Sequence, residues 1–423
     1  MIWTDPLAEI TRGVSPGNWV IRGATQRPGN PLRVTPPRSS LPLPETPGML
    51  RRHPMNPVLL DHPRTDPGRI LHYRDRQYAA ELLAAAILHF DFFTELQRAG
   101  GLDTNGLCER LGIADRPADV LLTLCRANGF ITTDASGVHQ PTPTAAEHLV
   151  RGSPWYLGPY YSPLRDTPLV QSFVQVLRTG KPGHWMARPG GRDWHESMQS
   201  EDFAREFTGI MNARGLALGQ ALARALATEL ARRRRVLDVA GGSGIYAATL
   251  GAAHPHLELI VLEQPPVDAL ARRELERHGL GHRAWVVAGD MFRDPWPEAD
   301  VILLSNVLHD WGLPEVRALI TRAAEVLPAD GLLVIHDAFI HDDKTGPLTT
   351  AEYSALLMHI SQGKCYSAAE YGSVLATAGF EPAPPRPTLA DRGYLVARRV
   401  CPPPGRHGAP DGSAPLFGSN QGP

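Results

Sequence analysis

The pattern of hydrophobic and polar positions divides the chain into an early part with helical spacing and a later part in which strands and helices alternate. The later part contains short apolar runs of the kind that a strand buries on both faces, separated by stretches with the spacing of amphipathic helices. The expected strands are 236–239, 257–262, 285–291, 300–305 and 331–337, with a late apolar strand at 394–397. This alternation predicts an α/β domain with a doubly wound parallel sheet over residues 231–398.

The earlier part of the chain predicts helices and one hairpin. A strongly apolar helix is expected over 78–93, followed by shorter helices over 104–112 and 117–128 and by a β-hairpin within 130–140. Helix, helix and hairpin in this order are typical of a winged helix, which we place at 69–160. The helix over 78–93 carries more apolar surface than one small domain can bury, so we expect it to pack against a second copy of the chain in a homodimer.

The segments on either side of these two domains have simpler patterns. Residues 161–230 predict a helical connection, with one helix around 203–215 and a second over 216–231, which we expect to contribute to a substrate pocket. Residues 1–68 and 399–423 are rich in proline and glycine and lack a sustained period. Both ends are therefore expected to be disordered.

Composition and charge exclude several classes of protein. The 423 residues carry a net charge of −2, and the would-be recognition helix over 117–128 contains a single basic residue, Arg126, so we expect no nucleic-acid partner. No apolar run approaches the length of a membrane span, and the N-terminus has no apolar signal core, so we expect a cytoplasmic protein without a membrane partner. The four cysteines are scattered, which predicts reduced thiols and no metal site.

The most informative motif is the glycine-rich turn within 236–245. An apolar strand reaches Asp238, breaks into a turn with Gly242 and Gly244, and continues as a helix, and the second strand then ends on Glu263. Such a unit binds a nucleoside, because glycines let the backbone approach the ligand and the second acid takes the ribose hydroxyls. An NAD(P)-dependent oxidoreductase has a similar fingerprint, but Asp238 would face a pyrophosphate unfavourably. It suits a ligand with an ammonium group, such as S-adenosylmethionine.

The ends of the next three strands carry further candidate chemistry. Asp290 and Met291 follow the third strand, where Asp290 is expected to accept a hydrogen bond from a base and Met291 to lie on the face of that base. His309 follows the fourth strand and is a candidate general base near neutral pH. Asp337 ends the fifth strand and is expected to orient His309 and to stabilise its protonated form.

Taken together, these segments resemble the S-adenosylmethionine-dependent small-molecule O-methyltransferases of the plant caffeate and bacterial antibiotic-tailoring type, over roughly residues 70–398. The resemblance implies a Rossmann-like methyltransferase domain preceded by an all-α, winged-helix dimerisation domain. It also implies that His309 is the general base and that Asp337 is one of two acids supporting it. The residues expected to bind the cofactor are Asp238, Gly242, Gly244, Glu263, Asp290, Met291, Ser305 and Trp311.

Two positions depart from the family pattern. Ala240 replaces the first glycine of the turn, and Cys365 falls where the plant enzymes carry their second supporting acid. The incomplete set of acids leaves open a C- or N-methyltransferase of the same fold. A non-catalytic winged-helix ligand sensor is the alternative from another class.

The resulting prediction is an enzyme that moves a methyl group to a hydroxyl of a small aromatic secondary metabolite. The residues expected to contact this acceptor are Met211, Asn212, Met358, His359 and Cys365. In this mechanism His309 removes the hydroxyl proton while the substrate is held against the methyl group, and much of the rate comes from placement.

Overall fold

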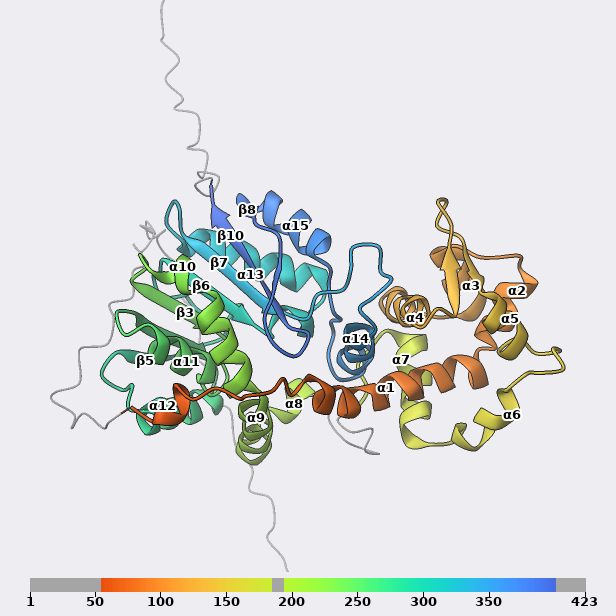
Figure 1. Ribbon diagram of the computed structural model, residues 1–423, viewed down its shortest axis with the longest axis horizontal. Coiled ribbons are helices and arrows are strands. Elements are labelled where there is room, and N and C mark those ends of the chain that lie inside the picture. The colour runs from red at the N-terminus through yellow and green to blue at the C-terminus, as the bar shows by residue number, and fades with distance from the viewer. Residues whose placement is uncertain (1–54, 185–193, 401–423) are drawn as a thin grey trace, which may run out of the picture. The chain divides into compact units, whose positions relative to one another are not determined.

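The computed structural model describes residues 55–184 and 194–400, and its centre is one large mixed β-sheet (Figure 1). The strands run in the order β5-β4-β3-β6-β7-β10-β8, and β9 pairs with β10. They comprise β3 (Arg235–Val239), β4 (Glu258–Glu263), β5 (Ala284–Ala288), β6 (Val301–Ser305), β7 (Leu332–Asp337), β8 (Phe380–Pro382), β9 (Arg386–Pro387) and β10 (Gly393–Arg399).

The five strands β5-β4-β3-β6-β7 are parallel, as predicted, whereas β10 is antiparallel to β7, β8 and β9. The predicted doubly wound α/β fold is confirmed, and the antiparallel strands at the C-terminal side are a feature that the prediction did not include. An apolar run shows that a strand is buried but not in which direction it runs, so the pattern around 394–397 could not reveal this. Because the five parallel strands share a direction, their carboxyl ends meet at one edge of the sheet.

Alternate residues of the central strands pack on opposite faces of the sheet. In β3, Val236 lies in a cluster with α9 (Glu201–Ala225), α11 (Ile245–Ala253) and α12 (Val267–Arg277). Its neighbour Leu237 lies in a second cluster with α13 (Leu313–Val326) and α15 (Ala368–Thr377). This alternation follows from the two-residue period of a strand and buries both faces, which explains why these strands are continuously apolar.

The part of the chain before the sheet is helical apart from one hairpin. Its elements are α1 (Gly68–His89), α2 (Phe92–Arg98), α3 (Thr104–Leu111), α4 (Asp115–Ala127), β1 (Ile131–Thr133), β2 (His139–Pro141), α5 (Pro143–His148), α6 (Gly158–Tyr161) and α7 (Pro168–Thr179). β1 and β2 are antiparallel, so the predicted order of two helices and a hairpin is present. Asp103 caps α3 through its side chain, and Gly112 ends the helix with φ +63°.

Two predicted helices have different boundaries in the structure. The single helix expected over 78–93 is wrong: α1 begins at Gly68 and ends at His89, and a break follows in which Asp91 takes φ 46°. The apolar run continues through this break because Phe92 and Phe93 are also fully buried, so hydrophobicity alone did not mark the turn. The pair of helices expected at 203–215 and 216–231 is instead α9, a single helix, followed by the short α10 (Ala227–Leu230).

The helix α14 (Leu348–Ile360) follows the parallel strands in sequence but belongs to the core of the helical region. Ala351, Ala355 and Met358 pack in the same cluster as residues of α1, α4 and α7. The side chain of Arg116, at the start of α4, donates to the main-chain oxygens of Met358 and Gly363 at 3.1 and 2.7 Å. This packing fixes α14 beside the sheet edge at which the parallel strands end.

The disorder that we expected over residues 1–68 does not reach residue 68, because part of this segment is ordered. Residues 1–54 lie outside the described residues, but Pro57–Leu59 form a 3-10 turn in which Leu59 is buried. The side chain of Gln220, on α9, donates to the main-chain oxygen of Val58 at 2.9 Å. A short apolar segment among prolines thus docks on the sheet domain, a contact that composition does not reveal. Among the helices of the described residues, none has an apolar stretch long enough to cross a bilayer.

Candidate active site

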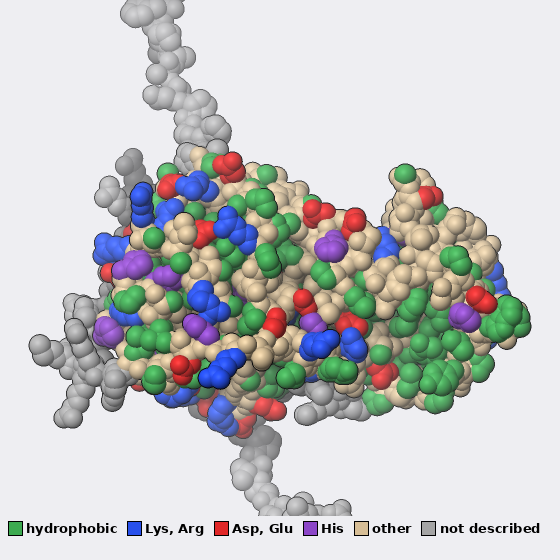
Figure 2. Space-filling model, in the orientation of Figure 1, with side chains coloured by type: hydrophobic (Ala, Val, Ile, Leu, Met, Phe, Trp, Pro, Cys, Tyr) green, Lys and Arg blue, Asp and Glu red, His purple; other side chains and the backbone are tan. Residues whose placement is uncertain are grey.

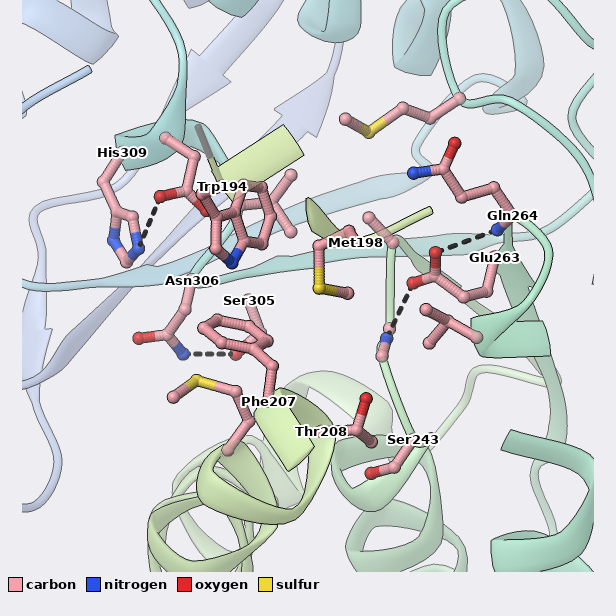
Figure 3. A pocket seen from close by; sticks show the side chains of 18 of the residues that line it. Trp194, Met198, Phe207, Thr208, Ser243, Glu263, Gln264, Ser305, Asn306 and His309 are labelled. Carbon is pink, nitrogen blue, oxygen red and sulfur yellow. Dashed lines mark hydrogen bonds and ion pairs between the residues drawn. The ribbon is translucent and has the colours of Figure 1, made fainter. Parts of the chain in front are cut away.

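A cavity of about 350 Å³ lies at the edge where the parallel strands end (Figure 3). Its walls come from the loops after β3, β4, β5 and β6 and from side chains of α8 (Trp194–Ser197), α9 and α14. The predicted site residues that line it are Met211, Asp238, Gly242, Glu263, Asp290, Met291, Ser305, His309 and Trp311.

The glycine turn after β3 presents main chain to this cavity. Ala240, Gly242 and Gly244 have φ values of 52°, 59° and 74°, in the left-handed region that glycine adopts without strain. A Cβ atom placed on Gly242 would meet no atom within 4 Å, so the backbone there is open to a ligand. The Gly242 N–H donates to Oε2 of Glu263 at 2.9 Å, which joins the turn to the end of β4.

Two carboxylates lie at this end of the cavity. Glu263 also accepts the N–H of Gln264 at 2.8 Å, and burial raises its pKa to about 7 although both main-chain hydrogen bonds act to lower it (Figure 3). Burial also raises the pKa of Asp238 to about 7, and its Oδ2 atom is buried with no hydrogen-bond partner among the described residues. A buried carboxylate oxygen without a donor, at the wall of a cavity, is a binding group for a cation or a hydrogen-bond donor.

The loop after β5 and the segment after β6 form an aromatic wall. The Phe292 N–H donates to Oδ1 of Asp290 at 2.7 Å, which fixes the loop. The rings of Phe292 and Trp311 contact each other at a centroid distance of 4.7 Å, edge to face. Met291 packs beside them, so a flat apolar ligand has a complementary surface here.

The third part of the site is a histidine held by an aspartate. His309 lies in the 3-10 turn η4 (Leu308–Asp310), and its Nδ1 atom contacts Oδ1 of Asp337 at the end of β7. Asp337 also accepts the N–H of Ala338 at 2.7 Å and the hydroxyl of Tyr371 at 3.3 Å. Burial lowers the pKa of His309, but the Asp337 carboxylate more than offsets this and raises it to about 9. The remaining ring nitrogen, Nε2, lies 3.8 Å from Oδ1 of Asp310.

Comparison with known proteins assigns this site to a family. A family model described as an O-methyltransferase domain matches residues 172–381. The chain is 33% identical over 288 residues to a 3-hydroxy-5-methyl-1-naphthoate 3-O-methyltransferase of Streptomyces sahachiroi, covering 67% of this chain and 81% of that protein. The chain belongs to the O-methyltransferase family.

Solved structures with the same fold agree with this assignment. An O-methyltransferase family 2 protein from Planctomyces limnophilus, in complex with apigenin, is 32% identical, with a TM-score of 0.72, covering 81% of this chain and 98% of that chain. Human N-acetylserotonin methyltransferase, in complex with S-adenosylmethionine, shares the fold at 21% identity and a TM-score of 0.50, covering 79% and 97%. The cofactor of this O-methyltransferase is S-adenosylmethionine.

The residues present fit that cofactor. Asp238 offers the carboxylate oxygen without a donor, Gly242 offers open main chain, and Glu263 ends β4, where a ribose would sit. Gly244 does not line the cavity: a Cβ atom there would contact Leu275 and Val261 on the sheet side, at 3.4 Å. Its contribution is therefore to the close packing of the turn against the sheet.

Several residues that we expected to contact the acceptor lie elsewhere in this O-methyltransferase. Met358 and His359 do not line the cavity: Met358 is fully buried in the helical core, and Nε2 of His359 lies 2.8 Å from the hydroxyl of Ser172. The reason is helical spacing, because α14 turns Tyr353 and Ile360, seven positions apart, toward the cavity.

Cys365 and Asn212 also lie outside the cavity wall. Cys365 is buried behind it, and its N–H donates to the hydroxyl of Ser354 at 3.1 Å. Asn212 contacts the hydroxyl of Ser243 and so supports the glycine turn. Position 365, where a second supporting acid was expected in the plant enzymes, holds this buried cysteine, and the acid next to His309 in sequence, Asp310, lies 3.8 Å from Nε2 of the histidine.

A further group of cavity residues in this O-methyltransferase was not predicted from the sequence. Aromatic side chains from α8, α9 and α14 line the wall near the histidine, as Figure 3 shows for Trp194 and Phe207. The cavity residues without a sequence prediction include Trp194, Phe207, Arg214, Tyr246, Asn306, Tyr353 and Ile360. The spacing of Tyr353, Leu356, Leu357 and Ile360 on one face of a helix was the available signal, but it did not distinguish a cavity face from a core face.

Proposed function

We propose that this O-methyltransferase transfers the methyl group of S-adenosylmethionine to a hydroxyl of a small aromatic acceptor, with His309 as the general base. The observation that carries this proposal is the buried pair of His309 and Asp337 at the cavity wall. With Nδ1 directed at Asp337, the imidazole keeps Nε2 available to accept a proton from a bound hydroxyl. This arrangement suits a methyl acceptor that must lose a proton during the reaction.

The cofactor supplies an electrophilic methyl group, and the chain's own residues would hold it through the loops after the strands. Asp238 would pair with the ammonium group and Glu263 with the ribose hydroxyls, while Gly242 allows close approach of the main chain. Asp290 and Met291 would contact the adenine, beside the ring of Trp311. These roles support the proposal because all of these residues line the same wall.

The acceptor would lie among the aromatic and aliphatic side chains near the histidine. Trp194, Phe207, Met211 and Ile360 line this part of the cavity, and their flat and flexible surfaces suit a ring system. The relative from Streptomyces sahachiroi acts on a hydroxylated naphthoate, and the Planctomyces limnophilus protein was solved with apigenin. Both support an aromatic acceptor for this chain.

Product analysis tests this function and separates it from carbon or nitrogen methylation. The full chain is incubated with methyl-labelled S-adenosylmethionine and a set of phenols, naphthols and matched arylamines, and products are identified by mass spectrometry and NMR. We expect label on oxygen, and we expect Asp337→Asn to reduce its formation, because Asp337 orients the base. Label found only on carbon or nitrogen would refute the proposal.

We further propose that the chain forms a homodimer through its helical region. Large apolar side chains gather over α1 and α6 (Figure 2), where Ile70, Tyr73 and Tyr160 are 77%, 76% and 82% exposed. Exposed apolar surface of this kind is typical of an interface. Light scattering is expected to give twice the mass of the chain at micromolar concentration, and Tyr73→Glu together with Tyr160→Glu is expected to reduce it. A monomeric wild-type protein would exclude the dimer.

A further inference from the structure

Arg214 is a cation at the cavity wall that the proposed reaction does not use. It lies on α9, lines the cavity and is partly buried. Among the described residues it forms no ion pair with a carboxylate, and its guanidinium donates one hydrogen bond, to the hydroxyl of Tyr353 at 3.1 Å. A guanidinium carries five N–H donors, so most of this group's hydrogen-bonding capacity is directed at no protein side chain.

The surroundings of Arg214 place it at the histidine end of the cavity. The ring of Tyr353, which Arg214 contacts, lies edge to face with the His309 ring at a centroid distance of 5.7 Å. The guanidinium of Arg392 lies 4.1 Å from the centre of the same tyrosine ring and donates to the side-chain oxygen of Asn306 at 3.3 Å. The region therefore holds two cations next to the position expected for the reacting hydroxyl.

The acid that interacts with Arg214 forms its ion pair with another arginine. Asp75, on α1, interacts electrostatically with Arg214 but pairs directly with Arg74, whose Nη1 atom lies 3.1 Å from its Oδ1. Burial lowers the pKa of Arg214, but the oxygens of Tyr353 and Tyr246 and the Asp75 carboxylate more than offset it, so Arg214 remains charged. A cation that is largely removed from water is costly unless a partner charge meets it. No carboxylate of residues 55–184 and 194–400 forms an ion pair with Arg214, so a ligand in the cavity can supply the partner.

We propose that Arg214 binds a carboxylate carried by the methyl acceptor, so that the substrate class is aromatic hydroxy acids. This inference rests on the proposed function in that it takes the acceptor to occupy the cavity beside His309. The planar fork of a guanidinium matches a carboxylate in a bidentate pair and fixes the orientation of a rigid ring. Held in this way, the ring is anchored at its acidic group while the aromatic side chains cover its faces, and only a hydroxyl at a suitable ring position reaches His309.

The cofactor also carries a carboxylate, and the two sources predict different results. Arg214 contacts Tyr353 near His309, whereas the residues proposed to hold the cofactor, Asp238 and Glu263, flank the glycine turn. An acceptor partner predicts that removing the charge of Arg214 changes acceptor binding alone. A cofactor partner predicts weaker binding of S-adenosylhomocysteine.

The first test uses the unaltered full chain and needs no methyl transfer. Hydroxynaphthoic acids that differ in the position of the carboxylate are titrated by calorimetry into the protein saturated with S-adenosylhomocysteine, each beside its methyl ester. We expect at least one acid to bind about 10- to 100-fold more tightly than its ester, the range for charge-assisted hydrogen bonds. If no acid binds more tightly than its ester, the inference is overturned. Absence of O-methylated product would refute the proposed function and leave this binding result intact.

The second test removes the charge. Arg214→Gln is expected to weaken binding of the preferred acid by about 10- to 100-fold, to leave its ester unchanged and to leave S-adenosylhomocysteine affinity unchanged, with partial rescue by Arg214→Lys. Arg205→Gln, on the same helix, removes an exposed arginine that pairs with Asp202 and serves as the matched control. Equal losses for acid and ester, or a loss of S-adenosylhomocysteine affinity, would overturn the inference. If Arg214→Gln does not fold, as judged by thermal unfolding, the comparison of acid and ester decides alone.

Discussion

The two ends of the cavity are built in different ways. The end proposed to hold the cofactor consists of a glycine turn and single residues that follow consecutive strands, all within residues 236–291 apart from Ser305 and Trp311. The end proposed to hold the acceptor is assembled from α8, α9, α14 and the turn after β6, which lie far apart in sequence. The first end uses main chain and strand order, which many related enzymes can share. The second end uses side chains on helix faces, and these can change with the substrate.

The largest effect is expected for the residue where the two ends meet. His309→Ala should lower kcat by about 10²- to 10⁴-fold, the usual contribution of a general base, with S-adenosylhomocysteine affinity nearly unchanged. His256→Ala, at a histidine remote from the cavity that contacts the Leu230 carbonyl at 3.1 Å, is the control and should have normal activity. Near-normal turnover in His309→Ala would show that the acceptor end works by placement alone.

The pH dependence of kcat/KM also tests whether His309 is the general base. With the pKa of His309 at about 9, the imidazole is mostly protonated at neutral pH, and only the neutral form accepts a proton. Between pH 7 and pH 9, kcat/KM should therefore rise by about 50-fold and then level off above pH 9. Asp337→Asn removes the charge that raises this pKa, so its profile should level off at lower pH and lower rate. A flat wild-type profile would contradict the assignment of His309 as the base.

A smaller effect is expected at the cofactor end. Glu263→Ala should weaken S-adenosylhomocysteine binding by about 1–3 kcal/mol, because charge-assisted hydrogen bonds are lost. Glu258→Ala changes an acid at the opposite end of the same strand, where it pairs with Arg235, and should leave binding unchanged. Calorimetry on both variants decides whether the ribose site lies at the end of β4, since unchanged affinity in Glu263→Ala would exclude it.

The smallest catalytic effect is expected on the cavity face of α14. Ile360→Ala should raise the KM of an aromatic acceptor several-fold, corresponding to about 1 kcal/mol of lost apolar contact. Met358→Ala, two residues away but in the helical core, should instead lower the free energy of unfolding by about 2–5 kcal/mol with little change in KM. If kinetics and urea unfolding gave the opposite pattern, Met358 would face the cavity and Ile360 would belong to the core.

Most of the residues predicted at the end proposed for the cofactor line one cavity, because the signals that mark them in the sequence are local. A strand, a turn with Gly242 and an acid such as Glu263 follow one another at characteristic spacings, and strand order brings them to one edge. The same reasoning placed His309 and Asp337 together, since they follow adjacent parallel strands β6 and β7. The antiparallel direction of β10 was missed, because burial of a strand does not encode its direction.

The acceptor end was not predictable in the same way. Met358 and His359 were expected at the cavity, whereas Tyr353 and Ile360 face it. The prediction failed because α14 is apolar on all sides, so its sequence does not show which side faces the cavity. Arg214 gave no local signal either, since one arginine on a long helix is ordinary until its surroundings are known. The family pattern showed that Cys365 holds the position of a second acid, but it did not show that Asp310 lies 3.8 Å from Nε2 of the histidine.

The two-sided burial of α14 has a consequence for how new specificities arise. One side of this helix packs through Ala351, Ala355 and Met358 in the core shared with α1, and the other presents Tyr353 and Ile360 to the cavity. Tyr353 is itself buried in that core, whereas Ile360 is only partly buried, so position 360 can be diversified with less risk of unfolding. A combinatorial library confined to position 360 and to Phe207 on α9 would explore new acceptors on an intact scaffold.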